Sequence, residues 1–153
     1  MQIDLRELKD DVLRLQGEDP SEVFELNDDA FFKAERPLKY NLVATCILDE
    51  LLVKGTLETE ITCVCSRCAK SFCKVVREKE FCHMVKIPSG TEYVDLTEEA
   101  RESILLTFPS YPVCKPGCRG LCSRCGADLN KGDCSCRPDT ENRWDALNGL
   151  KLK

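Results

Sequence analysis

The sequence predicts an α+β protein in which an antiparallel β-meander and a few short helices precede a cysteine-rich C-terminal segment. Apolar and polar residues alternate from Leu38 onward, as in half-buried strands, and the stretch that begins at Asp95 changes to a helical pattern. Six of the twelve cysteines lie within residues 112–136. We therefore expect an α+β domain over residues 1–110, with an antiparallel sheet and one Cys-x2-Cys turn, followed by a cysteine-rich segment over residues 111–153.

The composition indicates a globular protein. The chain has 153 residues, 42% of them hydrophobic, which is enough for one ordinary domain with a core. Charged residues make up 32%, and no apolar run approaches the roughly 20 residues that a membrane-spanning helix requires. The N-terminal sequence MQIDLRELKDD lacks the basic start and apolar stretch of a secretory signal. We expect a cytoplasmic bacterial protein, and in that reducing compartment clustered thiols more often bind metal than form disulfides.

A short amphipathic helix is predicted near the N-terminus. The apolar positions of residues 5–16 fall near the helical spacing, at Leu5, Leu8, Val12 and Leu15. The GEDPS stretch that follows breaks this pattern.

Three strands are predicted to follow as the meander. The first has alternating apolar positions at Leu38, Tyr40, Leu42, Ala44, Cys46 and Leu48. After a break near Asp49 and Glu50, the second strand has them at Val53, Leu57, Ile61 and Cys63, and it forms a hairpin with the first. The third strand is KSFCKVVREKEFCHMVKI, rich in Phe and Val, and the CSRC sequence before it occupies the turn between strands two and three.

Four cysteines fall on or beside these strands. We interpret Cys46, Cys73 and Cys82 as small apolar strand residues rather than ligands, because free cysteines are often buried. Cys63 lies two residues before Cys65, and its role stays open.

Two further helices are predicted. The first is DLTEEARESILLTFP, where Asp95 and Glu98 have the spacing of a capping box and Pro109 ends the helix. The second lies in the C-terminal tail, where Trp144, Leu147 and Leu150 share one helical face. We interpret Trp144 as an anchor that packs this helix on the cysteine-rich segment, with base stacking as the alternative.

The chain contains two Cys-x2-Cys turns, one at Cys65 and Cys68 and the other at Cys122 and Cys125. Such a turn offers two sulfur ligands to one metal ion, and zinc takes four ligands in a tetrahedron. Gly126 follows the second turn and can adopt the positive φ that closes it.

Each turn needs a second pair of cysteines. Cys134 and Cys136 follow the second turn closely and complete one local site with Cys122 and Cys125. The remaining pair then joins the first turn, in a site that links segments far apart in the sequence: Cys65, Cys68, Cys114 and Cys118. The sequence thus predicts two zinc ions and makes residues 111–153 a zinc-binding segment, although the same four thiolates also accept iron.

A redox enzyme is the alternative, since Cys-x2-Cys also serves thioredoxin-like chemistry. That motif ends a strand and opens a helix, whereas neither turn here precedes a helical pattern. His83 is the only histidine, and the sequence has neither a glycine-rich phosphate loop nor a Ser/His/Asp constellation. We expect no enzymatic activity.

Basic residues gather around the cysteines, although the net charge is −5. Residues 62–88 carry six basic and two acidic side chains, residues 111–137 carry five and two, and residues 1–60 are acidic. A four-thiolate zinc site adds about −2, so a positive charge of about 3 would remain across the two basic segments. Such a patch suits contact with phosphate. We expect five basic side chains to lie toward one face: Arg67, Lys70, Arg119, Arg124 and Lys131.

Three motifs in the last 90 or so residues carry a resemblance to a known family. They are CSRC, then CKPGCRGLCSRCGADLNKGDCSC, and finally NRWDALNGLKLK. In their order and in their residues, these motifs resemble the YceD-like family of bacterial proteins linked to accumulation of large-subunit (23S) ribosomal RNA. Ser123 departs from the pattern, because the family commonly has proline there.

The resemblance implies a non-enzymatic factor that supports 23S rRNA accumulation and large ribosomal subunit biogenesis. The expected partner is large-subunit ribosomal RNA or its precursor, bound directly or through a ribosomal or processing protein, with no membrane and no small-molecule substrate. The alternative is a zinc-stapled protein–protein adaptor that acts on a ribosomal protein or processing enzyme through its acidic N-terminal portion without contacting RNA.

Overall fold

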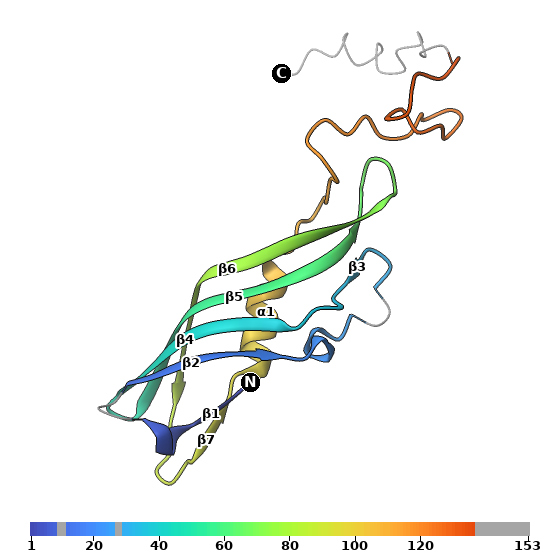
Figure 1. The fold of residues 1–153 in the computed structure, drawn as a ribbon. Coiled ribbons are helices and arrows are strands. Elements are labelled where there is room, and N and C mark those ends of the chain that lie inside the picture. Colours follow the sequence, from blue (N-terminus) through green and yellow to red (C-terminus); the bar gives the residue numbers. More distant parts are fainter. Residues whose placement is uncertain (9–11, 27–28, 137–153) are drawn as a thin grey trace, which may run out of the picture.

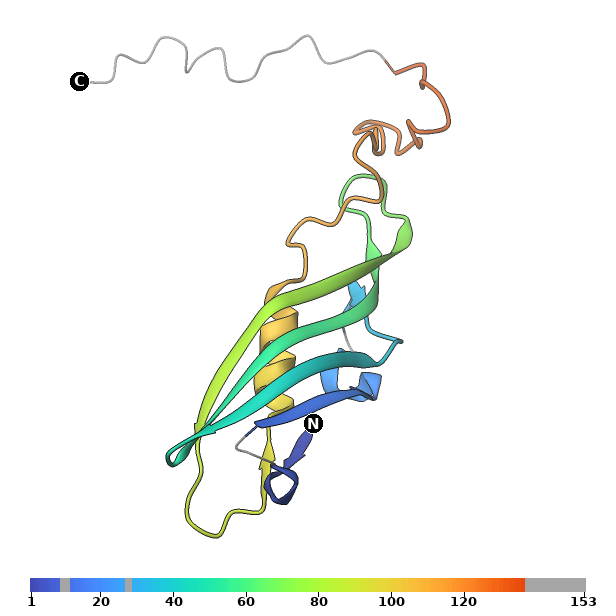
Figure 2. The same ribbon diagram turned by 60° about the vertical axis from the view of Figure 1, so that its left-hand side comes forward.

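A computed structural model describes residues 1–8, 12–26 and 29–136 of the chain. Figures 1 and 2 show a twisted antiparallel sheet with one α-helix lying across one face, and a cysteine-rich segment beyond one end of the sheet. The elements in chain order are β1 (Gln2–Asp4), the 3-10 turn η1 (Leu5–Glu7), β2 (Val12–Asp19), the 3-10 turn η2 (Ser21–Phe24), β3 (Phe32–Lys33), β4 (Leu38–Ile47), β5 (Glu50–Val64), β6 (Ser71–Lys86), β7 (Tyr93–Asp95) and α1 (Thr97–Leu106).

The predicted meander of β4, β5 and β6 is confirmed. The order along the main sheet is β2-β4-β5, β6 pairs with the other edge of β5, and short β3 pairs with β5 near its end. Leu48 and Asp49 form the two-residue turn between β4 and β5. Leu48 has a φ of 60° and is 95% exposed, so it lies in the turn and not in the predicted strand.

The main core lies between the sheet and α1. Alternate residues of β5 face the helix, and the four predicted apolar positions of this strand, Val53, Leu57, Ile61 and Cys63, are all fully buried. Ala100 and Ile104 of α1 pack into the same core. The apolar face of the sheet and the apolar face of α1 therefore pack against each other in two layers. This explains why the sequence shows both the alternation of a strand and the spacing of a helix.

The predicted N-terminal helix is wrong. Residues 5–7 form only the turn η1, and residues 12–19 form strand β2. Leu13 and Leu15 are two residues apart, so they lie on the same side of a strand, and both pack against the core. Pairing with β4 over eight residue pairs, from Val12 opposite Thr45 onward, favours the strand over local helical propensity.

Helix α1 confirms the helix predicted after Asp95. The Asp95 carboxylate accepts a hydrogen bond from the Thr97 backbone N–H at 3.0 Å. Glu98 binds Arg101 at 3.1 Å rather than completing a capping box. The helix ends before Pro109, as expected, and the structure gives one α-helix within its described residues rather than a few.

The interpretation of three strand cysteines is correct in part. Cys46, Cys73 and Cys82 lie on β4 and β6, but Cys73 and Cys82 are exposed and not buried. Cys73 pairs with Thr62, whose side chain lies on the face of the sheet opposite α1. Cys63, by contrast, is fully buried in the core, and burial raises the pKa of its thiol.

The predicted tail helix with Trp144, Leu147 and Leu150 lies outside the described residues. In the part of the chain that is described, α1 is too short and too polar to cross a membrane.

Candidate metal centres

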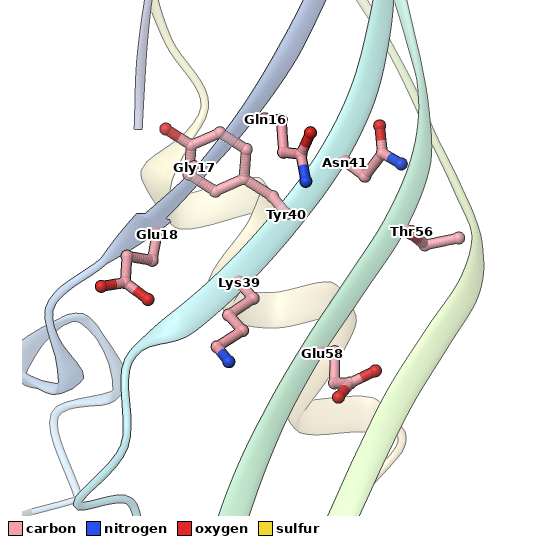
Figure 3. A pocket seen from close by; sticks show the side chains of 8 residues that line it. All are labelled: Gln16, Gly17, Glu18, Lys39, Tyr40, Asn41, Thr56 and Glu58. Carbon is pink, nitrogen blue, oxygen red and sulfur yellow. The ribbon is translucent and has the colours of Figure 1, made fainter.

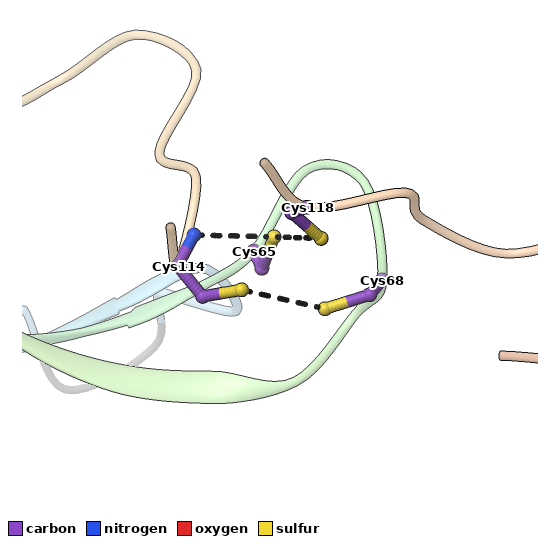
Figure 4. Close-up of side chains that lie close together, drawn as sticks. All are labelled: Cys65, Cys68, Cys114 and Cys118. Atoms are coloured by element: carbon purple, nitrogen blue, oxygen red, sulfur yellow. Dashed lines mark hydrogen bonds between the residues drawn. The ribbon is translucent and has the colours of Figure 1, made fainter. Parts of the chain in front are cut away.

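The first cysteine cluster joins the turn after β5 to the segment after α1 (Figure 4). Cys65 and Cys68 lie in the turn, and Cys114 and Cys118 approach it from the later segment. The Sγ atoms of Cys65 and Cys118 are 4.0 Å apart, and those of Cys68 and Cys114 are 3.8 Å apart. All four sulfurs lie within 4.8 Å of one another. Four sulfurs bound to one zinc ion at about 2.3 Å would be about 3.8 Å apart, so the arrangement fits a tetrahedral site.

Backbone hydrogen bonds shape the first turn. The Cys65 N–H donates to the Lys70 carbonyl, and the Ala69 N–H donates back to the Cys65 carbonyl, each at 2.9 Å. Ala69 closes the turn with a φ of 55°, in the left-handed region. This geometry turns the side chains of Cys65 and Cys68 toward the same point.

The later segment is held against this turn by main-chain contacts. The Ser66 N–H donates to the Pro112 carbonyl at 2.8 Å, and the Leu121 N–H donates to the Arg67 carbonyl at 3.0 Å. Gly120 has a φ of 77°, and a Cβ atom at this position would lie 2.8 Å from the Arg67 oxygen. A glycine is therefore required where the two segments meet.

Three cysteines of the first cluster are buried, Cys114 is half-buried, and the pKa values of the four thiols differ. A backbone N–H of Cys114 donates to the Cys65 sulfur at 3.4 Å, and this bond, with further amides of the turn, lowers the pKa of Cys65 to about 6. Burial and the neighbouring thiols raise the pKa of Cys114 to about 12. Thiolates packed this closely repel one another, and a divalent cation among them supplies the opposing charge.

The second cluster is local and repeats the same turn. The sulfurs of four residues lie within 4.8 Å of one another: Cys122, Cys125, Cys134 and Cys136. The Cys122 N–H donates to the Ala127 carbonyl at 2.8 Å, and the Gly126 N–H donates to the Cys122 carbonyl at 2.9 Å. Backbone N–H groups of Cys125 and Arg124 lower the pKa of Cys122 to about 6.

The structure thus brings the eight predicted cysteines together in the two predicted groups of four. Both groups offer only soft sulfur donors, which suit zinc or iron. Their role as metal ligands stays a prediction.

Sequence reasoning missed the residues that join the two clusters. Asp128 and Asn130 belong to the loop of the second cluster, and both reach the first. Asp128 forms an ion pair with Lys70, and the Asn130 side-chain amide donates to the Cys118 sulfur at 3.5 Å. The Leu129 N–H also donates to the Gly120 carbonyl at 3.0 Å. The only signal in the sequence was the GADLN stretch that follows the second turn.

Among the five basic residues expected to lie toward one face, Arg67, Lys70 and Arg119 contact other groups of the protein. The Arg67 guanidinium donates to the Cys118 carbonyl at 3.0 Å. Lys70 pairs with Asp128, and Arg119 pairs with Asp133. These contacts stabilise the junction of the two segments and reduce the positive charge available to a phosphate backbone.

An open depression on the sheet lies away from the cysteines (Figure 3). Its lining comes from β2, β4 and β5 and mixes neutral, acidic and basic side chains. The Tyr40 ring lies over Gly17, where a Cβ atom would be 2.6 Å from the Tyr40 oxygen. Burial and the nearby Asp19 raise the pKa of Tyr40. We assign no chemistry to this depression.

The fold and the two clusters define a mostly antiparallel α+β protein with two candidate four-cysteine metal centres. Residues 80–151 match the family model described as "Large ribosomal RNA subunit accumulation protein YceD". This match, together with the relatives described next, confirms the predicted resemblance to the YceD-like family.

Relatives with curated descriptions agree with the family match. The chain is 34% identical over 64 residues to the Zea mays "Large ribosomal RNA subunit accumulation protein YCED homolog 1, chloroplastic", a match that covers 41% of this chain and 22% of the relative. The Arabidopsis thaliana protein of the same description is 29% identical over 65 residues, covering 42% and 20%. The matched region thus spans about a fifth of the length of these chloroplast proteins.

An uncharacterized protein of Mycobacterium tuberculosis matches nearly the whole chain. It is 25% identical over 162 residues, covering 90% of this chain and 78% of the relative. No solved structure matches the chain.

Proposed function

We propose that this protein is a non-enzymatic, zinc-binding cytoplasmic factor that supports 23S rRNA accumulation and large ribosomal subunit biogenesis. The observation that carries the proposal is the family match over residues 80–151, a region that contains six of the eight clustered cysteines. The family's description links it to accumulation of the large ribosomal RNA subunit.

The proposed role of the metal is structural. Four cysteines close the coordination shell of a tetrahedral ion, whereas a catalytic zinc site keeps one position for water or substrate. The first site would tie the turn after β5 to residues 112–121, and the second would order the loop that packs on it. Eight thiolates correspond to two ions per chain, and native mass spectrometry with elemental analysis would distinguish zinc from iron.

The proposed partner is large-subunit ribosomal RNA or its precursor, contacted directly or through a ribosomal or processing protein. A second candidate, the protein–protein adaptor that never contacts RNA, is favoured by one observation. Arg67, Lys70 and Arg119 all contact other groups of the chain, so they offer less charge to phosphate than the sequence suggested.

The function is tested in cells that lack the protein. We expect a reduced ratio of 23S to 16S rRNA, restored by the wild-type chain and not by a variant with Cys65→Ser and Cys122→Ser. Restoration by a chain in which Cys73→Ser removes an exposed strand thiol outside both clusters is the matched control. An unchanged rRNA ratio in the deletion strain would refute the proposed function.

Direct RNA contact is tested separately with purified protein. Lys115 and Lys131 are exposed beside the two clusters, so changing both to Glu should weaken RNA binding and reduce its salt slope by roughly one unit per lost contact. Lys79→Glu, on β6 and away from the clusters, is the control. A ribonuclease-resistant pull-down of a ribosomal or processing protein, with an unchanged salt slope, would favour the adaptor.

A further inference from the structure

The side chain of Asn130 makes three hydrogen bonds. Its side-chain amide donates to the Cys118 sulfur at 3.5 Å and to the Asp128 carboxylate at 2.8 Å. Its side-chain oxygen accepts from the Arg119 backbone N–H at 2.9 Å. Asn130 is therefore a residue of the second cluster's loop that touches a ligand of the first cluster.

The contact between Asn130 and Cys118 connects the two clusters because of where Asn130 lies in the chain. Asn130 lies between Cys125 and Cys134, so it is part of the loop that a metal at the second cluster would close. Asp128 stands in the same loop and pairs with Lys70, beside the first Cys-x2-Cys turn. Ordering this loop positions both side chains. The loop therefore loses conformational entropy once, while two contacts to the first turn and its cluster form.

We propose that the two metal sites are thermodynamically linked through Asn130, so that metal at the second cluster increases the affinity of the first. This inference rests on the proposed metal sites and adds a positioning residue and a direction of coupling to them. An N–H donor to a coordinated thiolate disperses its negative charge and fixes the orientation of the sulfur. Loss of such an outer contact typically lowers metal affinity by about 10- to 100-fold.

The first test compares two single substitutions of equal charge change. Asn130→Asp keeps an oxygen for the Arg119 N–H but removes the amide that donates to Cys118 and to Asp128, and it places a negative charge beside both. Lys131→Gln alters the net charge by the same amount at the next, exposed residue. Zinc affinity of each site is measured by competition with a chromophoric chelator, and Co²⁺ absorption reports the geometry of the sulfur ligands.

We expect Asn130→Asp to lower the affinity of the first site by about 10- to 100-fold and to alter its Co²⁺ spectrum, with Lys131→Gln close to wild type. Equal effects of the two substitutions would mean that general charge, and not the Asn130 contact, sets the affinity. That outcome overturns the proposal.

The second test is a mutant cycle that combines loss of the second site with the substitution at Asn130, so it does not depend on one variant. Cys122→Ser with Cys125→Ser removes the second site, and the affinity of the first site should fall by about the same factor as in Asn130→Asp. Adding Asn130→Asp to this background should produce little further loss. By linkage, Cys65→Ser with Cys68→Ser should lower the affinity of the second site by the same factor.

These results separate the linkage from the metal sites themselves. Two independent sites with additive losses would overturn the linkage and leave the proposed zinc sites standing. Absence of metal from every variant and from the wild type would instead refute the zinc sites, and with them this inference.

Discussion

Ala69 and Gly126 occupy the same place in two turns of the same shape. Each follows the second cysteine of a Cys-x2-Cys pair, each donates its N–H back to the carbonyl of the first cysteine at 2.9 Å, and both have positive φ values, 55° and 71°. Glycine adopts this conformation without strain, whereas alanine does not. The first turn therefore contains strain that the second lacks.

Replacing Ala69 with Gly should stabilise the folded protein by about 1 kcal/mol, because relief of the left-handed strain exceeds the added entropy of the unfolded chain. The urea midpoint of the metal-loaded protein measures this. The reciprocal change Gly126→Ala should destabilise by a similar amount, since a Cβ atom there meets nothing within 4 Å and only the backbone is strained. A lower midpoint for Ala69→Gly would contradict this account.

Gly120→Ala should be more damaging than Gly126→Ala. Both residues have positive φ, but only at position 120 would the added Cβ approach a backbone oxygen, that of Arg67, at 2.8 Å. Strain and overpacking together should destabilise the junction by about 2 to 4 kcal/mol. Chelator competition should also show faster loss of metal from the first cluster, and equal midpoints for the two variants would argue against a close contact at Gly120.

The thiol of Cys122 should titrate at low pH in the metal-free protein. Backbone N–H groups lower its pKa from 9.0 to about 6, and its side chain is partly accessible. Because only the thiolate is alkylated, the rate of iodoacetamide modification at Cys122 should fall as the pH drops through about 6. Peptide mapping by mass spectrometry measures this rate, and an inflection near the unshifted pKa of 9.0 would contradict the hydrogen-bonding account.

The lowered pKa of Cys122 also makes the stability of the metal-free loop depend on pH. The folded chain releases the Cys122 proton at a lower pH than the unfolded chain, so this thiolate stabilises the metal-free loop above about pH 9. That contribution is lost as the pH falls through about 6. Exchange of amide hydrogens in residues 122–136 should therefore become faster on acidification of the metal-free protein. Bound metal should suppress this change near neutral pH.

Loss of the first site should detach the cysteine-rich segment and leave the sheet folded. Cys65, Cys68 and Cys118 form a small buried cluster separate from the main core of the sheet and α1. In Cys65→Ser, amide protection should fall in residues 112–121 and persist in β4 and β5, as measured by hydrogen exchange with mass spectrometry. Cys73→Ser serves as the control, and global unfolding of Cys65→Ser would show that the two cores depend on each other.

The sequence predicted the elements whose pattern is set by local contacts. The alternation of β5 follows from one buried face, so Leu57 was predicted as an apolar strand position from spacing alone, and Asp95 and Pro109 marked the limits of the helix α1. The grouping of the eight cysteines followed from the same kind of counting, because each Cys-x2-Cys turn supplies half of a tetrahedral donor set. The boundary after residue 110 stays a prediction.

The errors arose where partners distant in the chain decide the outcome. Leu5, Leu8, Val12 and Leu15 have helical spacing, but pairing of β2 with β4 places Leu15 opposite Leu42 in a sheet. Likewise, the prediction of a positive patch rested on numbers of charged residues, which do not show which basic side chains form ion pairs in the fold. Asp128 lies 58 residues from Lys70 in the chain, and the ion pair between them forms where the turn after β5 meets the later segment.

The close approach of sulfurs also leads to an expectation for how the metal-free protein would respond to oxidants. The Cys65–Cys118 and Cys68–Cys114 pairs each join the turn after β5 to the later segment, with sulfurs 4.0 and 3.8 Å apart. If metal leaves under oxidising conditions, either pair can pass two electrons to the oxidant, release two protons and form a disulfide. The same two segments would then be joined covalently, and metal could return only after reduction. Oxidative damage would thus fix the junction in place rather than open it.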